Sequence, residues 1–148
     1  MAISPFDAVK IQARVVIPIV KALEAEIGAE SAHRIVGDAI ADAWAAFTAS
    51  RSQERNTHPA TASGFDFPVE SEVVETAPDS HAVDMTGCAF ADYFRRIGEP
   101  EIGALLTCGV DFASERALRP DWEFRRTQTR MQGASHCDFR WRRRGNSG

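Results

Sequence analysis

Two runs of apolar residues at helical spacing open the chain. Residues 5–27 carry apolar side chains close to a 3.6-residue period, at Phe6, Val9, Ala13, Val16, Val20, Leu23 and Ile27. Gly28 supplies a stop, and Pro18 predicts a kink because it removes a backbone donor. A second helix is expected from about Ser31 to Thr48, with a stripe formed by Ile35, Val36, Ala39, Ile40, Ala43 and Phe47. Residues 1–48 therefore form a helical N-terminal part.

The middle of the chain changes from an irregular stretch to strand patterns. Residues 49–68 are polar and lose any period, which predicts a long connection. Phe65 and Phe67 in this connection either cover a pocket or anchor the loop on the core. Residues 69–76 and 81–87 have strand character, and the turn residues 77–80 between them predict a hairpin.

The pattern of residues 88–142 predicts two further helices and two further strands. A short helix is expected over residues 88–97, and Pro100 opens another that runs to about residue 115. Strands at residues 122–131 and 135–142 are expected to meet at a tight turn, residues 132–134. The order of elements predicts an α+β fold, in which a four-stranded antiparallel sheet packs with two N-terminal helices and two later helices. Residues 69–142 form the part of a single domain, 1–148, that carries the motifs.

Composition and charge limit the partners of this domain. A chain of 148 residues with 44% apolar and 26% charged residues has the balance of one globular domain. No apolar run approaches bilayer length, and a net charge of −4 gives no general attraction to nucleic acid or to an anionic membrane. The first residues lack the pattern of a secretory signal, so a cytoplasmic protein with reduced thiols is expected. The alanine-rich faces of the first two helices favour a homo-oligomer.

All three cysteines lie between residues 88 and 137, and two of them fall in predicted helices. Cys88 stands at the start of its helix, where the positive end of the helix dipole favours a thiolate. Cys108 lies three residues before Asp111, so one helical face presents a thiol and a carboxylate together. Both cysteines are also small enough to be ordinary core residues.

The final strand separates its side chains onto two faces. Alternation sends Cys137, Phe139 and Trp141 to one side and His136, Asp138 and Arg140 to the other. The first set is typical of a core, so Cys137 is a buried residue or a functional thiol. Arg140 is suited to a two-point grip on a substrate carboxylate, and Arg125 and Arg126 are alternatives. Tyr93 is a further candidate for contact with substrate.

A metal site is the less favoured interpretation of these residues. Zinc motifs pair their ligands at short spacing, whereas Cys88 and Cys108 are isolated in the sequence. His136 and Cys137 are adjacent but point to opposite sides of a strand. No cofactor is therefore expected, and a divalent metal such as zinc stays the alternative.

Four spaced motifs resemble the L-2-amino-thiazoline-4-carboxylic acid hydrolase family over about residues 68–142. They are Cys88-x-x-Ala91-x-Tyr93-Phe94-x-x-x-Gly98-x-x-Glu101, Cys108-x-x-Asp111, Phe124-Arg-Arg-Thr127-x-Thr129 and Gly133-x-x-x-Cys137-Asp138-Phe139-Arg140. The resemblance implies a cytosolic bacterial hydrolase that opens a small ring containing sulfur and nitrogen. Water adds at the carbon between the two heteroatoms, and the product of the named reaction is a carbamoyl-cysteine.

The residues and the resemblance together give a mechanistic hypothesis. A thiol, carboxylate and imidazole set drawn from Cys108, Asp111 and His136, with Cys88 and Cys137, is expected to open a small anionic, amidine-like heterocycle without metal. The alternative is a non-enzymatic module that senses a small ligand or a metal, because small α+β domains with a cysteine-bearing end strand resemble the vinyl-reductase-type sensor domains.

Overall fold

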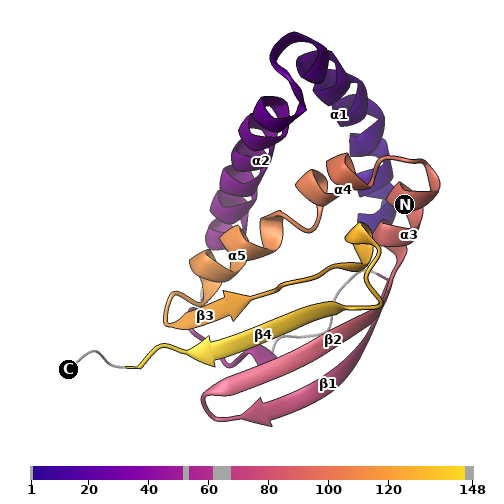
Figure 1. Cartoon of the computed structure of the whole chain (residues 1–148). Coiled ribbons are helices and arrows are strands. Elements are labelled where there is room, and N and C mark those ends of the chain that lie inside the picture. The colour runs from indigo at the N-terminus through magenta and orange to yellow at the C-terminus, as the bar shows by residue number, and fades with distance from the viewer. Residues whose placement is uncertain (1, 52–53, 62–67, 146–148) are drawn as a thin grey trace.

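The protein is an α+β domain in which the helices lie on one face of a four-stranded antiparallel sheet (Figure 1). The computed structural model describes residues 2–51, 54–61 and 68–145, so Phe65 and Phe67 lie outside the described residues. The strand order is β1-β2-β4-β3. The strands are β1 (Val69–Ala77), β2 (Ser80–Cys88), β3 (Trp122–Arg125) and β4 (Cys137–Arg143). The predicted fold class is confirmed.

Strands β1 and β2 form the predicted hairpin. Ala77 pairs with Ser80, so Pro78 and Asp79 make the tight connection between the strands. Strand β2 then pairs with β4 along its other edge, and β4 pairs with β3. This central β2–β4 pair joins the β1–β2 hairpin to the C-terminal part of the chain.

The two N-terminal helices are close to the predicted ranges. Helix α1 (Pro5–Ile27) begins at Ser4, whose hydroxyl accepts a hydrogen bond from Asp7 N at 3.0 Å, and it continues past Pro18. It ends at Gly28, which has a positive φ of 85° that few other residues adopt. Helix α2 (Ala29–Arg51) follows, and the two helices diverge from this turn in Figure 1.

The predicted stripe of α2 is wrong at four positions. Ala32 is buried and Val36 and Ile40 are half-buried, but Ile35 and Phe47 are exposed, as are the two alanines of the stripe, Ala39 and Ala43. The helix is rotated so that Gly37 lies against α4: a Cβ at this position would stand 3.1 Å from Leu105 Cδ2. A glycine that permits close helix packing therefore decides which face of α2 points inward.

The single helix predicted from Pro100 to about residue 115 is two helices, which follow the short helix α3 (Ala89–Arg96). Helix α4 (Pro100–Leu106) ends before Thr107, and three residues separate it from α5 (Val110–Leu118). Gly109 N donates to Ala104 O at 2.7 Å, a wider turn than the α-helical pattern, and Thr107 Oγ1 donates to Gly103 O at 2.8 Å. Threonine and glycine both have low helix propensity, so the break falls between them.

The strand predicted at residues 122–131 ends early, at Arg125. Beyond it the Asp138 carboxylate accepts hydrogen bonds from Thr127 N at 2.9 Å and from Gln128 N at 2.8 Å. These side-chain bonds replace the backbone ladder that a longer strand would need. A short 3₁₀ helix, η2 (Arg130–Gln132), and Gly133 with φ 95° then return the chain to β4.

The core has two parts, one around α3 and one on the inner face of the sheet. In the first, Phe94 packs directly on Gly103 of α4 and Met131 of η2 closes the cluster. In the second, Trp122 and Trp141 pack with Met85, and Trp141 Nε1 donates to Glu115 Oε2 of α5. None of the helices in the described part of the chain is long and apolar enough to cross a membrane.

Candidate active site

The break between α4 and α5 brings Cys108 and Asp111 together. The sequence predicted Cys108 on a helix, but Cys108 lies in the turn that connects α4 to α5. Asp111 lies in the first turn of α5. Asp111 N donates to Cys108 O at 3.4 Å, so the turn itself sets their separation. The thiol and the carboxylate are close through a local turn instead of through a shared helical face.

Arg126 links this turn to the segment after β3. Its Nη1 donates to Asp111 Oδ2 at 2.5 Å and its Nη2 donates to Cys108 O at 2.9 Å. The guanidinium also lies over the rings of Phe112 and Phe139, at 4.9 and 5.6 Å from their centroids. Only 7% of the Arg126 side chain is exposed, whereas Asp111 retains 34%. The guanidinium of Arg126 is therefore used for contacts within the protein, whereas the Asp111 carboxylate is accessible to a small molecule.

The dense surroundings of Asp111 change its acidity. Burial raises the pKa of Asp111 to about 6, although the positive charge and hydrogen bond of Arg126 act in the opposite direction. Although a third of its side chain is exposed, protein packs closely around the rest. A carboxyl group with this pKa exchanges a proton readily near neutral pH.

The Cys108 thiol is held in its neutral form. Burial raises the pKa of Cys108 to about 12, and the nearby Asp111 carboxylate acts in the same direction. Thr107 Oγ1 lies 3.6 Å from Cys108 Sγ and lowers the pKa by less than burial raises it. A thiol with this pKa is almost fully protonated at neutral pH.

The other two cysteines border the same region of the core. Cys88 ends β2 and precedes α3; burial raises the pKa of its thiol more than the backbone N–H groups of Phe90 and Ala91 lower it. The thiolate expected at this helix start is therefore not favoured. Cys137 is buried, and its Sγ accepts a hydrogen bond from Arg130 N at 3.3 Å. Burial likewise raises the pKa of Cys137.

Arg130 is a functional candidate that the sequence patterns did not indicate. Its Nη1 donates to Ser135 O at 2.8 Å and its Nη2 lies 3.7 Å from Asp92 Oδ1. Its Nε is buried and has no hydrogen-bond partner among the described residues. A buried guanidinium donor without a partner is costly unless a ligand completes it. The expected strand over residues 122–131 concealed this residue, because only the 3₁₀ turn η2 directs it beside Cys137.

His136 and Arg140 lie on the other face of the sheet. Arg140 Nη2 donates to Asp84 Oδ1 at 2.7 Å, and His136 Nε2 lies 3.5 Å from the second carboxylate oxygen of Asp84. Asp84 is paired in register with Asp138, and the buried Cys137 on β4 points to the opposite, helical side. The alternation of β4 is as predicted, but it separates His136 from Cys108 and Asp111. The five predicted catalytic residues do not form one set.

The remaining predicted substrate-binding residues are also apart from Asp111. A hollow of about 410 Å³ is lined by Glu75, Ser80, His81, Ala82, Glu123, Arg125, Arg140, Trp141 and Arg142. Within it Arg125 Nε donates to Glu123 Oε1 at 2.9 Å. Tyr93 packs instead against Phe6 and the α3 core. Asp84 is the missed residue of the sheet's outer face, and its position in the middle of a predicted strand was an available signal.

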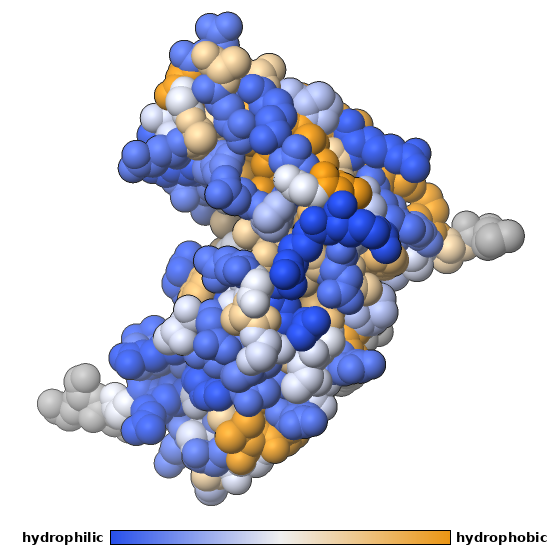
Figure 2. Space-filling view, turned by 45° about the vertical axis from the view of Figure 1, so that its right-hand side comes forward, coloured by the Kyte–Doolittle hydropathy of each residue, from blue (hydrophilic) through white to orange (hydrophobic). Residues whose placement is uncertain are grey.

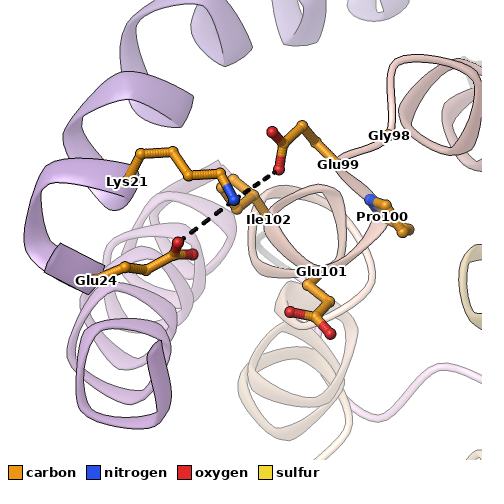
Figure 3. Close-up of a pocket in the computed structure, with 7 residues that line it drawn as sticks. All are labelled: Lys21, Glu24, Gly98, Glu99, Pro100, Glu101 and Ile102. Atoms are coloured by element: carbon orange, nitrogen blue, oxygen red, sulfur yellow. Dashed lines mark ion pairs between the residues drawn. The ribbon is translucent and has the colours of Figure 1, made fainter. Parts of the chain in front are cut away.

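A second hollow, of about 210 Å³, lies between α1 and the start of α4 (Figure 3). Lys21 Nζ bridges Glu24 and Glu99 at 3.4 and 3.2 Å, as the dashed lines of Figure 3 show. His33 Nε2 lies 2.7 Å from Glu24 Oε1 and extends these contacts to α2. Lys21, Glu24, Glu99 and His33 are thus paired with one another, and the cluster ties α1 to α2 and to the start of α4. Neither hollow includes a cysteine or Asp111.

Metal-binding groups do not converge in the described ranges. No group of three or more histidine, cysteine, aspartate or glutamate residues there is placed to hold a metal ion. The three thiols, Asp111 and Arg126 lie close enough to influence one another's charge, where the helices cover the sheet.

Comparison with known proteins identifies the family. No curated protein matches the chain. The family model for L-2-amino-thiazoline-4-carboxylic acid hydrolase matches residues 8–141. The match extends from the first turn of α1 into the last strand, β4. It includes the three cysteines, Asp111, Arg126 and Arg130. The chain belongs to the L-2-amino-thiazoline-4-carboxylic acid hydrolase family.

Proposed function

We propose that this protein is a hydrolase that opens a small anionic heterocycle, of the 2-amino-thiazoline-carboxylate type, by adding water at the carbon between sulfur and nitrogen. The observation that carries the proposal is the Asp111 carboxylate, which is fixed by Arg126 beside Cys108 and still exposes 34% of its side chain. The family match supports the substrate type.

Asp111 is the proposed general base. The ionised carboxylate takes a proton from water while the oxygen of that water forms a bond to the amidine-like carbon. As that bond forms, the electron pair of the C=N double bond moves to its nitrogen. The bond from this carbon to the ring sulfur then breaks, the proton held by Asp111 passes to the sulfur, and the second proton of the water moves from oxygen to nitrogen as the C=O group forms. One water molecule is consumed, and for the thiazoline substrate the product is a carbamoyl-cysteine. Arg126 acts as a positioning residue, since its guanidinium holds the carboxylate in one orientation.

Activated water is favoured over a thiolate as the nucleophile. Because the pKa of Cys108 is raised to about 12, the thiolate is scarce at neutral pH. A neutral thiol next to Asp111 is instead suited to donate a hydrogen bond to the developing charge on the departing atom. Cys88 and Cys137 then serve as packing on the wall of the site.

Arg130 is the proposed contact for the substrate carboxylate. Its buried Nε lacks a partner among the described residues, its backbone N–H donates to Cys137 Sγ, and its Nη2 lies 3.7 Å from Asp92 Oδ1 of α3. The guanidinium of Arg140 is occupied by Asp84 and by the carbonyl of Val83, to which it donates at 2.7 and 3.1 Å. A ligand bound by Arg130 would approach Asp111 from the side that the thiols line.

A second candidate function is binding of a small anion without turnover. The 410 Å³ hollow presents Arg125, Arg140 and Arg142 on the face of the sheet away from Asp111. Such a site would fit a sensing module. Arg125 and Arg140 are then ligand contacts, with no role for the cysteines.

The test is turnover of 2-amino-thiazoline-4-carboxylate by the purified full chain. Loss of the ring is followed by ultraviolet absorbance, and the product by the mass gain of one water molecule. Asp111→Asn is compared with Asp42→Asn, a matched change at an exposed position of α2. Loss of turnover in the first variant only, with no effect of a chelator on the wild type, is the expected result. Binding without turnover, measured by calorimetry, would replace the hydrolase by the sensing function.

A further inference from the structure

Helix α1 is apolar on two faces. Its inner face packs on the core through Ala13 and Val20, which are fully buried, and through half-buried neighbours. On the outer face, Ile11, Val15 and Ile19 expose 50%, 59% and 53% of their surface. Figure 2 turns the side of α1 forward and shows hydrophobic surface between hydrophilic patches in this helical part. A surface helix is ordinarily apolar on one face only, so the second face indicates a contact that one chain does not provide.

The outer face of α1 is symmetric about Val15. Its stripe, named here the α1 stripe, consists of Ala8, Ile11, Val15, Ile19 and Ala22. The intervals between these residues are three, four, four and three, and the residue types are the same in both directions. At about 100° per residue the five side chains fall within one narrow sector of the helix.

Such a stripe is complementary to itself when two copies meet in opposite directions. With a two-fold axis at Val15, Ile11 of one copy lies beside Ile19 of the other, and Ala8 beside Ala22. A two-fold interface requires this property, because the same patch must serve on both copies. The stripe Ile11, Val15 and Ile19 is also a ridge of four-residue spacing, which packs between the ridges of a second helix. We infer that the α1 stripe is the interface of an antiparallel homodimer of this chain.

The charges on α1 argue against a membrane surface as the partner of the α1 stripe. The helix carries three basic residues, Lys10, Arg14 and Lys21, and three acidic ones, Asp7, Glu24 and Glu26. A helix that lies on an anionic membrane has a basic polar face, which α1 lacks. Across the proposed two-fold axis, Gln12 of one copy faces Pro18 of the other, so this side of the interface brings no acidic residues together. Arg14 lies about 100° around the helix from Val15, on the same side of the interface as Arg14 of the second copy. The two positive charges repel each other, so added salt should strengthen the dimer.

The size of the stripe sets the strength of association. From Ala8 to Ala22 the helix extends about 21 Å and is about 10 Å wide. The footprint is on the order of 200–300 Å² per chain, against about 800 Å² for a standard partner surface. The dimer is therefore weak and in exchange with monomer.

Sedimentation equilibrium of the full chain over a range of concentrations is the first test. Wild type is expected to show a monomer–dimer equilibrium, and Val15→Asp to raise the dissociation constant at least tenfold, since two carboxylates would meet at the axis. Ile35→Asp, at an exposed isoleucine of α2, is the matched control and should leave the dissociation constant unchanged. A wild type that is monomeric at every concentration overturns the inference, as does a dimer that Val15→Asp does not weaken.

Disulfide formation tests the direction of the two helices. Val15→Cys is expected to form a covalent dimer under mild oxidation that wild type, with its native cysteines, does not form. Ile11→Cys alone should not form a covalent dimer, because position 11 of the two copies is separated by about 12 Å along the helix axis. A mixture of Ile11→Cys and Ile19→Cys should form one, because these two positions lie side by side. Efficient dimers of Ile11→Cys alone would indicate parallel helices and contradict the two-fold at Val15.

Discussion

Replacing Asp111 by asparagine removes a carboxyl group whose pKa, about 6, fits the proposed reaction. Asparagine keeps the shape and an oxygen that accepts from Arg126, but it does not take up a proton. A general base contributes about 10²–10⁴-fold to rate. We therefore expect Asp111→Asn to lower kcat by at least about 100-fold, with a KM within a few-fold of wild type.

The pH dependence follows from the raised pKa. With a pKa of about 6, Asp111 is about one-tenth ionised at pH 5 and about nine-tenths ionised at pH 7. Because the ionised form is the base, kcat/KM of wild type should rise about tenfold between these two pH values. The profile is measured by the ultraviolet assay in buffers of constant ionic strength. The residual activity of Asp111→Asn should lack this rise.

The same group makes folding stability depend on pH with a defined sign. The folded state holds its proton up to a pKa of about 6 and the unfolded state only to 3.8. The stabilisation is complete below pH 3.8 and is lost as pH rises through about 6. Full burial would give about 3 kcal/mol, and the exposure of 34% reduces this to about 1–2 kcal/mol. Urea unfolding of wild type and Asp111→Asn at pH 4 and pH 7 measures the difference.

Two results would refute the role of Asp111. One is a wild-type kcat/KM that does not change between pH 5 and 7, together with an Asp111→Asn variant of normal turnover. The other is activity that falls as pH rises through about 6, which would make Asp111 the acid and require another base. Unchanged circular dichroism of the variant is the control that the fold is intact.

The other predictions concern the thiol, the arginines and a packing contact. Cys108→Ser should retain turnover within about tenfold, because a thiol with a pKa near 12 is not the nucleophile; a covalent substrate adduct in the intact mass of wild type would contradict this. Arg130→Ala should raise KM at least tenfold with little change in kcat, whereas Arg140→Ala should leave KM within threefold; the reverse pattern would assign substrate to the hollow on the outer face. Gly103→Ala places a methyl 2.3 Å from Phe94 Cγ, so we expect a loss of about 3 kcal/mol and a Tm lower by about 6–12 °C. Gly145→Ala, with open space around it, is the control for the thermal melt, and an equal Tm in both variants would show that the Phe94 contact is not tight.

Local patterns determined most of the elements of this fold. The 3.6-residue period of α1, the glycine at its end and the alternation of the hairpin strands depend on neighbours within one turn or one strand. The break at residues 107–109 was not predicted, because the apolar positions keep their period on both sides of Gly109. The early end of β3 was also missed, since it depends on the Asp138 carboxylate eleven residues from Thr127.

The composition of the candidate site was visible in the sequence, but its grouping was not. Cys108 and Asp111 are near each other in the chain, so their association was predictable, whereas the pairing of Asp111 with Arg126 needed the fold. His136 was separated from them because adjacent residues of a strand point to opposite faces, and the helices cover only one. Side-chain chemistry is thus determined by sequence. The tertiary structure decides which of these groups share a face, how deeply each is buried and therefore which proton each one holds at neutral pH.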